Sequence, residues 1–130
     1  MSPMPPPSPI SIAQAFKNIN FLSNRTPEDS GNGDGFLSLA DYRDGGIFLA
    51  HYAGNSEWER HPKGDEMVMV MEGETTLILL HNGQEIRNRM SQGMLLVVPQ
   101  NIWHRFESPQ LVKIMTITPQ PTDHSVERPA

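Results

Sequence analysis

The stretch TLILLHNGQEIRNR, residues 76–89, decides the fold class because it predicts a β-hairpin. Asn82-Gly83 is the favoured pair for a type I′ turn, in which both central residues need a positive φ. Such a turn places Leu79 opposite Ile86 on neighbouring strands. Since side chains alternate along a strand, Leu79 and Ile86 share one face of this hairpin and Ile78 lies on the other.

Further strands are expected on both sides of the hairpin. Short apolar or alternating runs separated by turn residues cover 47–53, 57–61, 66–72, 74–81, 84–90, 94–98, 103–107 and 111–118. Regularly spaced short strands favour an antiparallel sandwich or barrel. Residues 11–19 predict one short helix with Ser11 as its cap, whereas residues 20–46 carry mainly turn signals. The sequence therefore predicts an all-β domain with a short N-terminal helix.

Proline marks the two ends of the chain. Five of the 12 prolines lie in residues 1–9 and three more lie in residues 119–130. Proline cannot donate a hydrogen bond to a strand neighbour. We therefore expect a disordered Pro-rich tail at residues 1–9, a folded domain at 10–118 and a flexible C-terminal tail at 119–130.

Composition narrows the class of partner. The 130 residues include 10 Lys+Arg and 15 Asp+Glu, a net charge of −5, which argues against nucleic acid and anionic membranes. No apolar run approaches the ~20 residues that cross a bilayer, and the N-terminal residues lack a signal-peptide pattern. There is no cysteine for a disulfide, a thiolate ligand or a nucleophile. We expect a cytoplasmic protein whose partner is a small-molecule ligand.

Four polar residues stand at positions that a barrel could bring together. Glu59 and His61 point to the same side of a strand, Glu66 opens the next strand after a turn, and His104 follows the turn at Pro99. Two imidazoles and one carboxylate, here His61, Glu66 and His104, form a facial triad for a divalent transition metal. Fe, Mn, Ni, Zn or Cu suits this set better than Ca²⁺ or Mg²⁺. A vestigial polar pocket is the alternative.

The spacing of these residues resembles that of the cupin superfamily, specifically the small single-domain cupins. The first motif, G-x5-H-x-H-x3/4-E-x6-G, and the second, G-x5-P-x-G-x2-H-x3-N, are matched in order by His61, Glu66, Gly73, Gly93, Pro99 and His104. Trp58 begins the W-x-x-H start of such small cupins. The resemblance implies a cupin-type double-stranded β-helix, a jelly-roll barrel, with a metal bound inside it.

The sequence departs from the family pattern at one ligand position. Glu59 stands where the family has its first histidine, and Ser108 stands at the position of the final asparagine. A second carboxylate would cancel the charge of a divalent ion and leave a weaker Lewis acid. Glu59 could ligate the metal or only hydrogen-bond to a ligand or substrate. His81 beside the hairpin turn and His124 in the C-terminal tail are not site candidates.

The residues that are expected to face the barrel interior predict the wall of the pocket. The expected pocket residues are Val68, Val70, Leu77, Leu79 and Phe106, with His51 as a further candidate that could instead be structural. A metal within such a wall suits an isomerase, lyase or dioxygenase acting on a small sugar or organic acid. The alternatives are a non-catalytic small-molecule-binding or sensor cupin and a purely structural dimer. The fold alone names no reaction.

Methionines on the outer face predict association. Met67, Met69 and Met71 alternate with the residues expected to face inward, so they would point outward. An exposed apolar patch of this kind marks an interface. The alternative is that these methionines cover a core between two sheets. Cupins are commonly homodimers, and the resemblance therefore implies a homodimer here.

Overall fold

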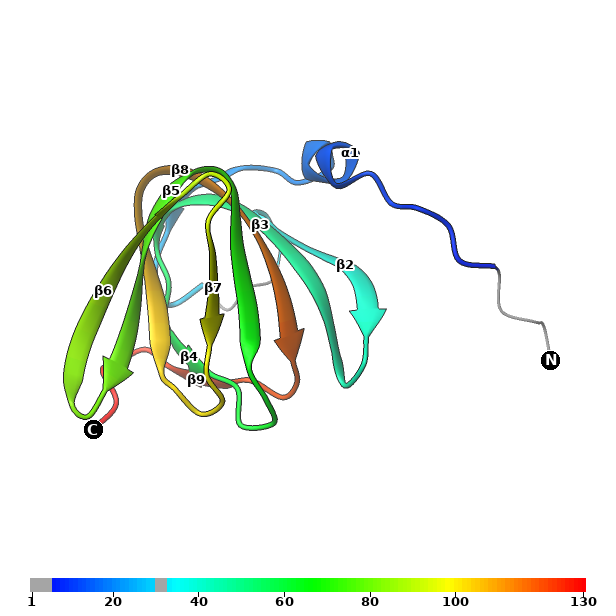
Figure 1. The fold of residues 1–130 in the computed structure, drawn as a ribbon. Coiled ribbons are helices and arrows are strands. Elements are labelled where there is room, and N and C mark those ends of the chain that lie inside the picture. Colours follow the sequence, from blue (N-terminus) through cyan, green and yellow to red (C-terminus); the bar gives the residue numbers. More distant parts are fainter. Residues whose placement is uncertain (1–5, 30–32) are drawn as a thin grey trace.

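A computed structural model describes residues 6–29 and 33–130 of the chain, so most of the expected N-terminal tail, residues 1–5, lies outside the described residues. The described part contains a single helix and nine strands (Figure 1). They are, in chain order, α1 (Ile12–Lys17), β1 (Leu22–Arg25), β2 (Phe36–Tyr42), β3 (Gly45–Asn55), β4 (Trp58–Arg60), β5 (Glu66–His81), β6 (Gln84–Ser91), β7 (Leu95–Val98), β8 (His104–Pro119) and β9 (Asp123–Ser125). No described helix is long and apolar enough to cross a membrane.

The described strands belong to one sheet that is folded over on itself. Every strand pair is antiparallel except β1 with β3. β8 pairs with β3 along one edge and with β5 along the other, while β5 also carries β6 and β7. Figure 1 shows β3, β5 and β8 bending at one end, so that the sheet forms a cup, although its hydrogen-bonded path stays open. The all-β jelly-roll prediction is confirmed.

The predicted hairpin and helix are present. Asn82 and Gly83 have φ values of 51° and 77°, and Leu79 pairs with Ile86. The hydroxyl of Ser11 accepts a hydrogen bond from the Gln14 amide at 3.1 Å, which caps α1. Local sequence is enough for both features because a turn pair and a cap act over three or four residues.

Gly73 joins two expected strands into one. The predicted strands 66–72 and 74–81 are the halves of the 16-residue β5. The register against β8 shifts on each side of Gly73, whose φ is +76° and whose added Cβ would lie 2.1 Å from the Leu111 carbonyl oxygen. The shift moves the inward positions from Val68 and Val70 in the first half to Leu77 in the second.

Two apolar clusters lie on opposite faces of the sheet. The interior of the cup is filled by Tyr52, Val68, Val70, Leu77, Met90, Val98, Phe106, Val112 and Ile114. Outside, α1 packs through Ala15 and Phe16 onto Leu49 of β3, with Met71 and Met115 beside them. Because α1 covers only this part of the outer face, it leaves the interior free for a site.

Two sequence expectations differ from the structure, and one outward-facing side chain is more buried than its position suggests. Residues 20–46, expected to be turns, contain β1 and β2, which are held by pairing with β3. Residues 123–125, expected to be part of a flexible tail, form β9 against β4. Ile78 faces outward as expected but is 0% exposed, because its register partners Arg87 and Arg105 flank it. Pairing with distant strands produces the first two differences, and the neighbouring side chains on β6 and β8 account for the burial of Ile78.

Candidate functional site

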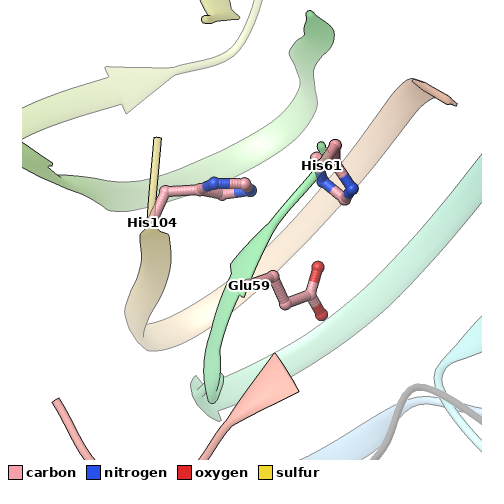
Figure 2. Close-up of side chains that lie close together, drawn as sticks. All are labelled: Glu59, His61 and His104. Atoms are coloured by element: carbon pink, nitrogen blue, oxygen red, sulfur yellow. The ribbon is translucent and has the colours of Figure 1, made fainter. Parts of the chain in front are cut away.

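Strand pairing brings the four predicted ligand residues to one point inside the cup. Glu59 of β4 is the register partner of His104, the first residue of β8, so the two side chains point to the same side of the sheet. His61 follows β4 two positions after Glu59, and Glu66 opens β5. Figure 2 shows the side chains of Glu59, His61 and His104 close together, with the His104 ring extending toward His61.

The side chains are close enough to share an ion. Glu59, His61 and His104 each offer a ligand atom, and these atoms lie within 4.8 Å of one another. The Glu66 carboxylate lies between the imidazoles, with Oε2 3.2 Å from His61 Nε2 and Oε1 3.0 Å from His104 Nε2. His61, Glu66 and His104 are at most 4% exposed.

Neighbouring groups hold the side of each ligand that faces away from the cluster. The Nδ1 of His104 lies 2.9 Å from the carbonyl oxygen of Ile102, to which an Nδ1–H donates. The Nδ1 of His61 lies 3.0 Å from the hydroxyl of Thr122. Thr118 donates its hydroxyl to Glu66 Oε2 at 2.6 Å. Such contacts orient an imidazole and leave its second nitrogen free to bind a metal.

Three buried atoms of this cluster have no hydrogen bond: His61 Nε2, His104 Nε2 and Glu66 Oε1. The two imidazole nitrogens lie at ion-pair distance from the Glu66 carboxylate but without hydrogen-bond geometry. Buried polar atoms are normally hydrogen-bonded, because losing water without a partner costs free energy. Two imidazole nitrogens and a carboxylate oxygen are ligands that a divalent transition metal prefers. The residues present therefore fit a metal ion.

The electrostatics keep Glu66 ionised. Burial by itself raises the pKa of Glu66, but the contacts and charges of His104 and His61 outweigh it and lower the pKa to about 2. Burial opposes the charge of His104, yet Glu66 raises the pKa of that imidazole overall. The pKa of Glu59 is raised, first by burial and then by the charge of Glu66. At neutral pH, Glu66 is therefore anionic.

A cavity of about 520 Å³ opens next to the cluster. This is within the range of small-molecule sites. It is lined by aromatic, apolar and polar side chains, among them Arg25, Phe36, Tyr52, Glu59, His61, Glu66, Phe106, Ile114, Thr116, Thr118, Thr122 and His124. The wall is therefore more polar than the aliphatic wall expected from the sequence.

The predicted pocket residues separate into three groups. Phe106 lines the cavity, whereas Val68, Val70, Leu77 and Leu79 pack in the core of the cup. His51 lies on the other face of β3 from Tyr52, with its ring 4.9 Å from that of Phe21. His51 is therefore outside the cavity, because successive side chains of β3 point to opposite faces and Tyr52 points inward.

Sequence reasoning missed several cavity residues. Arg25 comes from a segment interpreted as turns, and Thr122 and His124 come from a segment interpreted as a tail. His124 forms a second cluster with Glu57 and Glu59, whose ligand atoms lie within 4.8 Å of one another. Glu57 could have been found from the sequence, because in the expected strand 57–61 it lies two residues before Glu59 and so shares its face. No local pattern marks Arg25 or His124, because each depends on pairing with a distant strand.

Comparison with known proteins agrees with this geometry. The family model of the cupin domain matches residues 48–118 of this chain. This match spans more than half of the chain, which therefore belongs to the cupin domain family.

Relatives share the fold at low sequence identity. The protein YdbB of Bacillus subtilis (strain 168) is 28% identical over 93 residues, 72% of this chain and 76% of the relative. A cupin-2 domain containing protein from Shewanella frigidimarina is 23% identical, with a TM-score of 0.64 over 85% of this chain and 94% of its own. Hydroquinone 1,2-dioxygenase PnpCD, solved in complex with Cd²⁺ and 4-hydroxybenzonitrile, is 17% identical, with a TM-score of 0.59 over 67% and 64% of the two chains. Likeness at this level establishes the fold.

Proposed function

We propose that the protein binds a divalent transition metal ion inside the cup, on His61, Glu66 and His104, with Glu59 as a fourth ligand or close neighbour. One observation carries the proposal: three buried ligand atoms converge without hydrogen bonds, while the opposite side of each ligand is held by Ile102, Thr122 or Thr118. Fe, Mn, Ni, Zn and Cu all accept such a nitrogen and oxygen set.

The proposed activity is that of a metal-dependent enzyme on a small sugar or organic acid, of the isomerase, lyase or dioxygenase type. A bound ion would act as a Lewis acid toward an oxygen of that molecule. The chain would supply the rest: Thr118 and Thr122 orient the ligands, and the apolar ring of Phe106 limits water in the cavity. A metal-dependent dioxygenase on the same fold is compatible with this proposal.

Glu59 favours a second candidate, a binding or sensor cupin without turnover. A carboxylate at this position adds a second negative charge beside Glu66 and would weaken the Lewis acidity of a divalent ion. The enzyme requires both the metal and the cavity, whereas the binding or sensor cupin requires only the cavity and has no turnover. Product formation by metal-loaded protein from a bound small molecule would select the enzyme.

Metal content tests the proposed metal site, which the enzyme requires. We expect purified wild type, after supplementation, to hold close to one metal ion per chain by elemental analysis. His61→Ala and His104→Ala each remove a buried ligand and should lose most of it. The matched control is His81→Ala, since His81 is exposed on the hairpin. Circular dichroism checks that each variant is folded. Metal far below one per chain in wild type, or equal retention in folded His61→Ala and His104→Ala, contradicts the site.

We further propose a cytoplasmic homodimer. The register places Met67 opposite Val97 and Met69 opposite Leu95, so these four side chains share the outer face of β5 and β7. Leu95 is 52% exposed and Val97 is 48% exposed. Met71, by contrast, packs in the cluster that α1 covers. An exposed apolar strip beside an unpaired strand edge supports association with a second copy.

A further inference from the structure

Arg25 is a buried cation that lacks an anionic partner. It ends β1, is 6% exposed and lines the cavity next to the metal cluster. Its Nε has no hydrogen-bond partner, and no carboxylate of the described residues lies within ion-pair distance of its guanidinium. Residues 1–5 and 30–32 contain no Asp or Glu. The charge of Arg25 opposes the rise in the pKa of Glu59, so Glu59 lies nearby, but no carboxylate of the described residues forms an ion pair with the guanidinium.

The position of Arg25 is set by its surroundings. Its guanidinium carbon lies 4.7 Å from the ring centre of Phe36 and 4.6 Å from that of Tyr52. Its backbone is pressed against Gly54, where φ is +117° and an added Cβ would lie 2.2 Å from the Arg25 carbonyl oxygen. The faces of the two rings attract the cation. Arg25 is therefore held in place while its Nε makes no hydrogen bond.

Tyr52 provides a second unmatched group on the same wall. Its side chain is 0% exposed, and its hydroxyl has no hydrogen-bond partner. Both Tyr52 and Arg25 line the cavity that Glu59, His61 and Glu66 also line. An unpaired buried cation and an unpaired buried hydroxyl each cost free energy, so their presence in one cavity indicates a ligand that complements them.

We propose that Arg25 binds the carboxylate of a small organic acid in this cavity, with the Tyr52 hydroxyl as a second donor. The planar guanidinium presents two parallel N–H groups that match a carboxylate, and the bond is strengthened by charge. A neutral sugar would leave Arg25 without a direct ion-pair partner. This inference rests on the proposed metal site, for which it selects organic acids over sugars as the ligand class.

Binding of matched acids and amides tests the proposal. The probes are benzoate, succinate and pyruvate with their amides, titrated into metal-loaded protein and followed by ligand-observed NMR and thermal shift. We expect at least one acid to bind, with its amide about tenfold weaker or worse. Arg25→Gln should weaken acid binding by about tenfold or more. Arg89→Gln is the matched control, because the Arg89 side chain is 82% exposed.

A second variant and a metal measurement make the outcome unambiguous. Tyr52→Phe removes only an unpartnered hydroxyl, so it should stay folded and bind the acid several-fold more weakly. If no acid binds, if acid and amide bind equally, or if folded Arg25→Gln and Tyr52→Phe both keep wild-type affinity, the proposal is overturned. Arg25→Gln should keep its metal. Loss of acid binding with metal retained separates this inference from the metal site. Wild type that takes up no metal after supplementation but still binds acids through Arg25 would refute only the metal site.

Discussion

Charged residues on the two faces of β8 differ in the contacts that they make. On the outer face, Arg105 contacts Glu107 at 2.6 Å and lies over the ring of Trp58 at 5.3 Å, and Arg87 also contacts Glu107. On the inner face, one position away along the chain, His104 keeps an Nε2 without a hydrogen bond. The outer charges neutralise one another, whereas the inner imidazole lies 3.0 Å from the Glu66 carboxylate without a hydrogen bond at its Nε2.

The comparison indicates what each face needs. The interior combines unpaired ligand atoms at His61, Glu66 and His104 with an unpaired cation at Arg25, so it complements an ion and an anionic molecule. The exterior pairs Arg87 and Arg105 with Glu107 but leaves apolar side chains such as Leu95 exposed, so it complements an apolar surface. The interior and the exterior therefore lack different kinds of contact, and each indicates a different kind of partner.

The largest effect is expected on the exterior. Met69→Glu would place an unpaired charge in the proposed dimer interface, which costs on the order of 3 kcal/mol. We expect this variant to be monomeric by size-exclusion chromatography with light scattering at concentrations where wild type is dimeric. Ile86→Glu is the control, since Ile86 is 44% exposed on β6, away from this strip. A dimeric Met69→Glu protein, or a monomeric wild type, would contradict the proposed dimer interface on the exterior.

An intermediate effect is expected at Glu59 in the interior. Glu59→Gln keeps the shape of the side chain but removes one negative charge from the cluster. We expect metal affinity, measured by competition with a chelator, to fall by about 10–100-fold, less than the loss for His104→Ala. Glu74→Gln is the control, because the Glu74 side chain is 53% exposed. Unchanged affinity in Glu59→Gln would show that Glu59 takes no part in holding the ion.

The smallest effect is expected at Glu107. Burial by itself raises the pKa of Glu107, but the hydrogen bonds from Arg87 and Arg105 outweigh it, so the pKa lies below its ordinary value of 4.5. The folded state then binds a proton less readily than the unfolded state. Glu107 therefore adds stability above about pH 4.5, and this stability is lost as the pH falls through its lower folded pKa.

Urea unfolding of Glu107→Gln at several pH values measures this contribution. We expect a free energy of unfolding lower than that of wild type by no more than about 1 kcal/mol at pH 7, with the difference disappearing in acid. Glu28→Gln, at an exposed position outside the ion pairs of the described residues, should show no such trend. A difference that grows toward low pH would contradict a lowered pKa at Glu107.

The sequence alone determined the hairpin at Asn82-Gly83, the short helix after Ser11, and the spacing of His61, Glu66 and His104 that indicates a cupin. These features are readable because a turn pair, a helix cap and a motif are local or depend only on residue type and spacing. Only the tertiary structure decided that β1 and β9 join the sheet and bring Arg25, Thr122 and His124 to the cavity. It also showed that His51 faces away. The reason is physical: which face a residue occupies, and whether its charge finds a partner, depends on pairing between strands that are far apart in the chain.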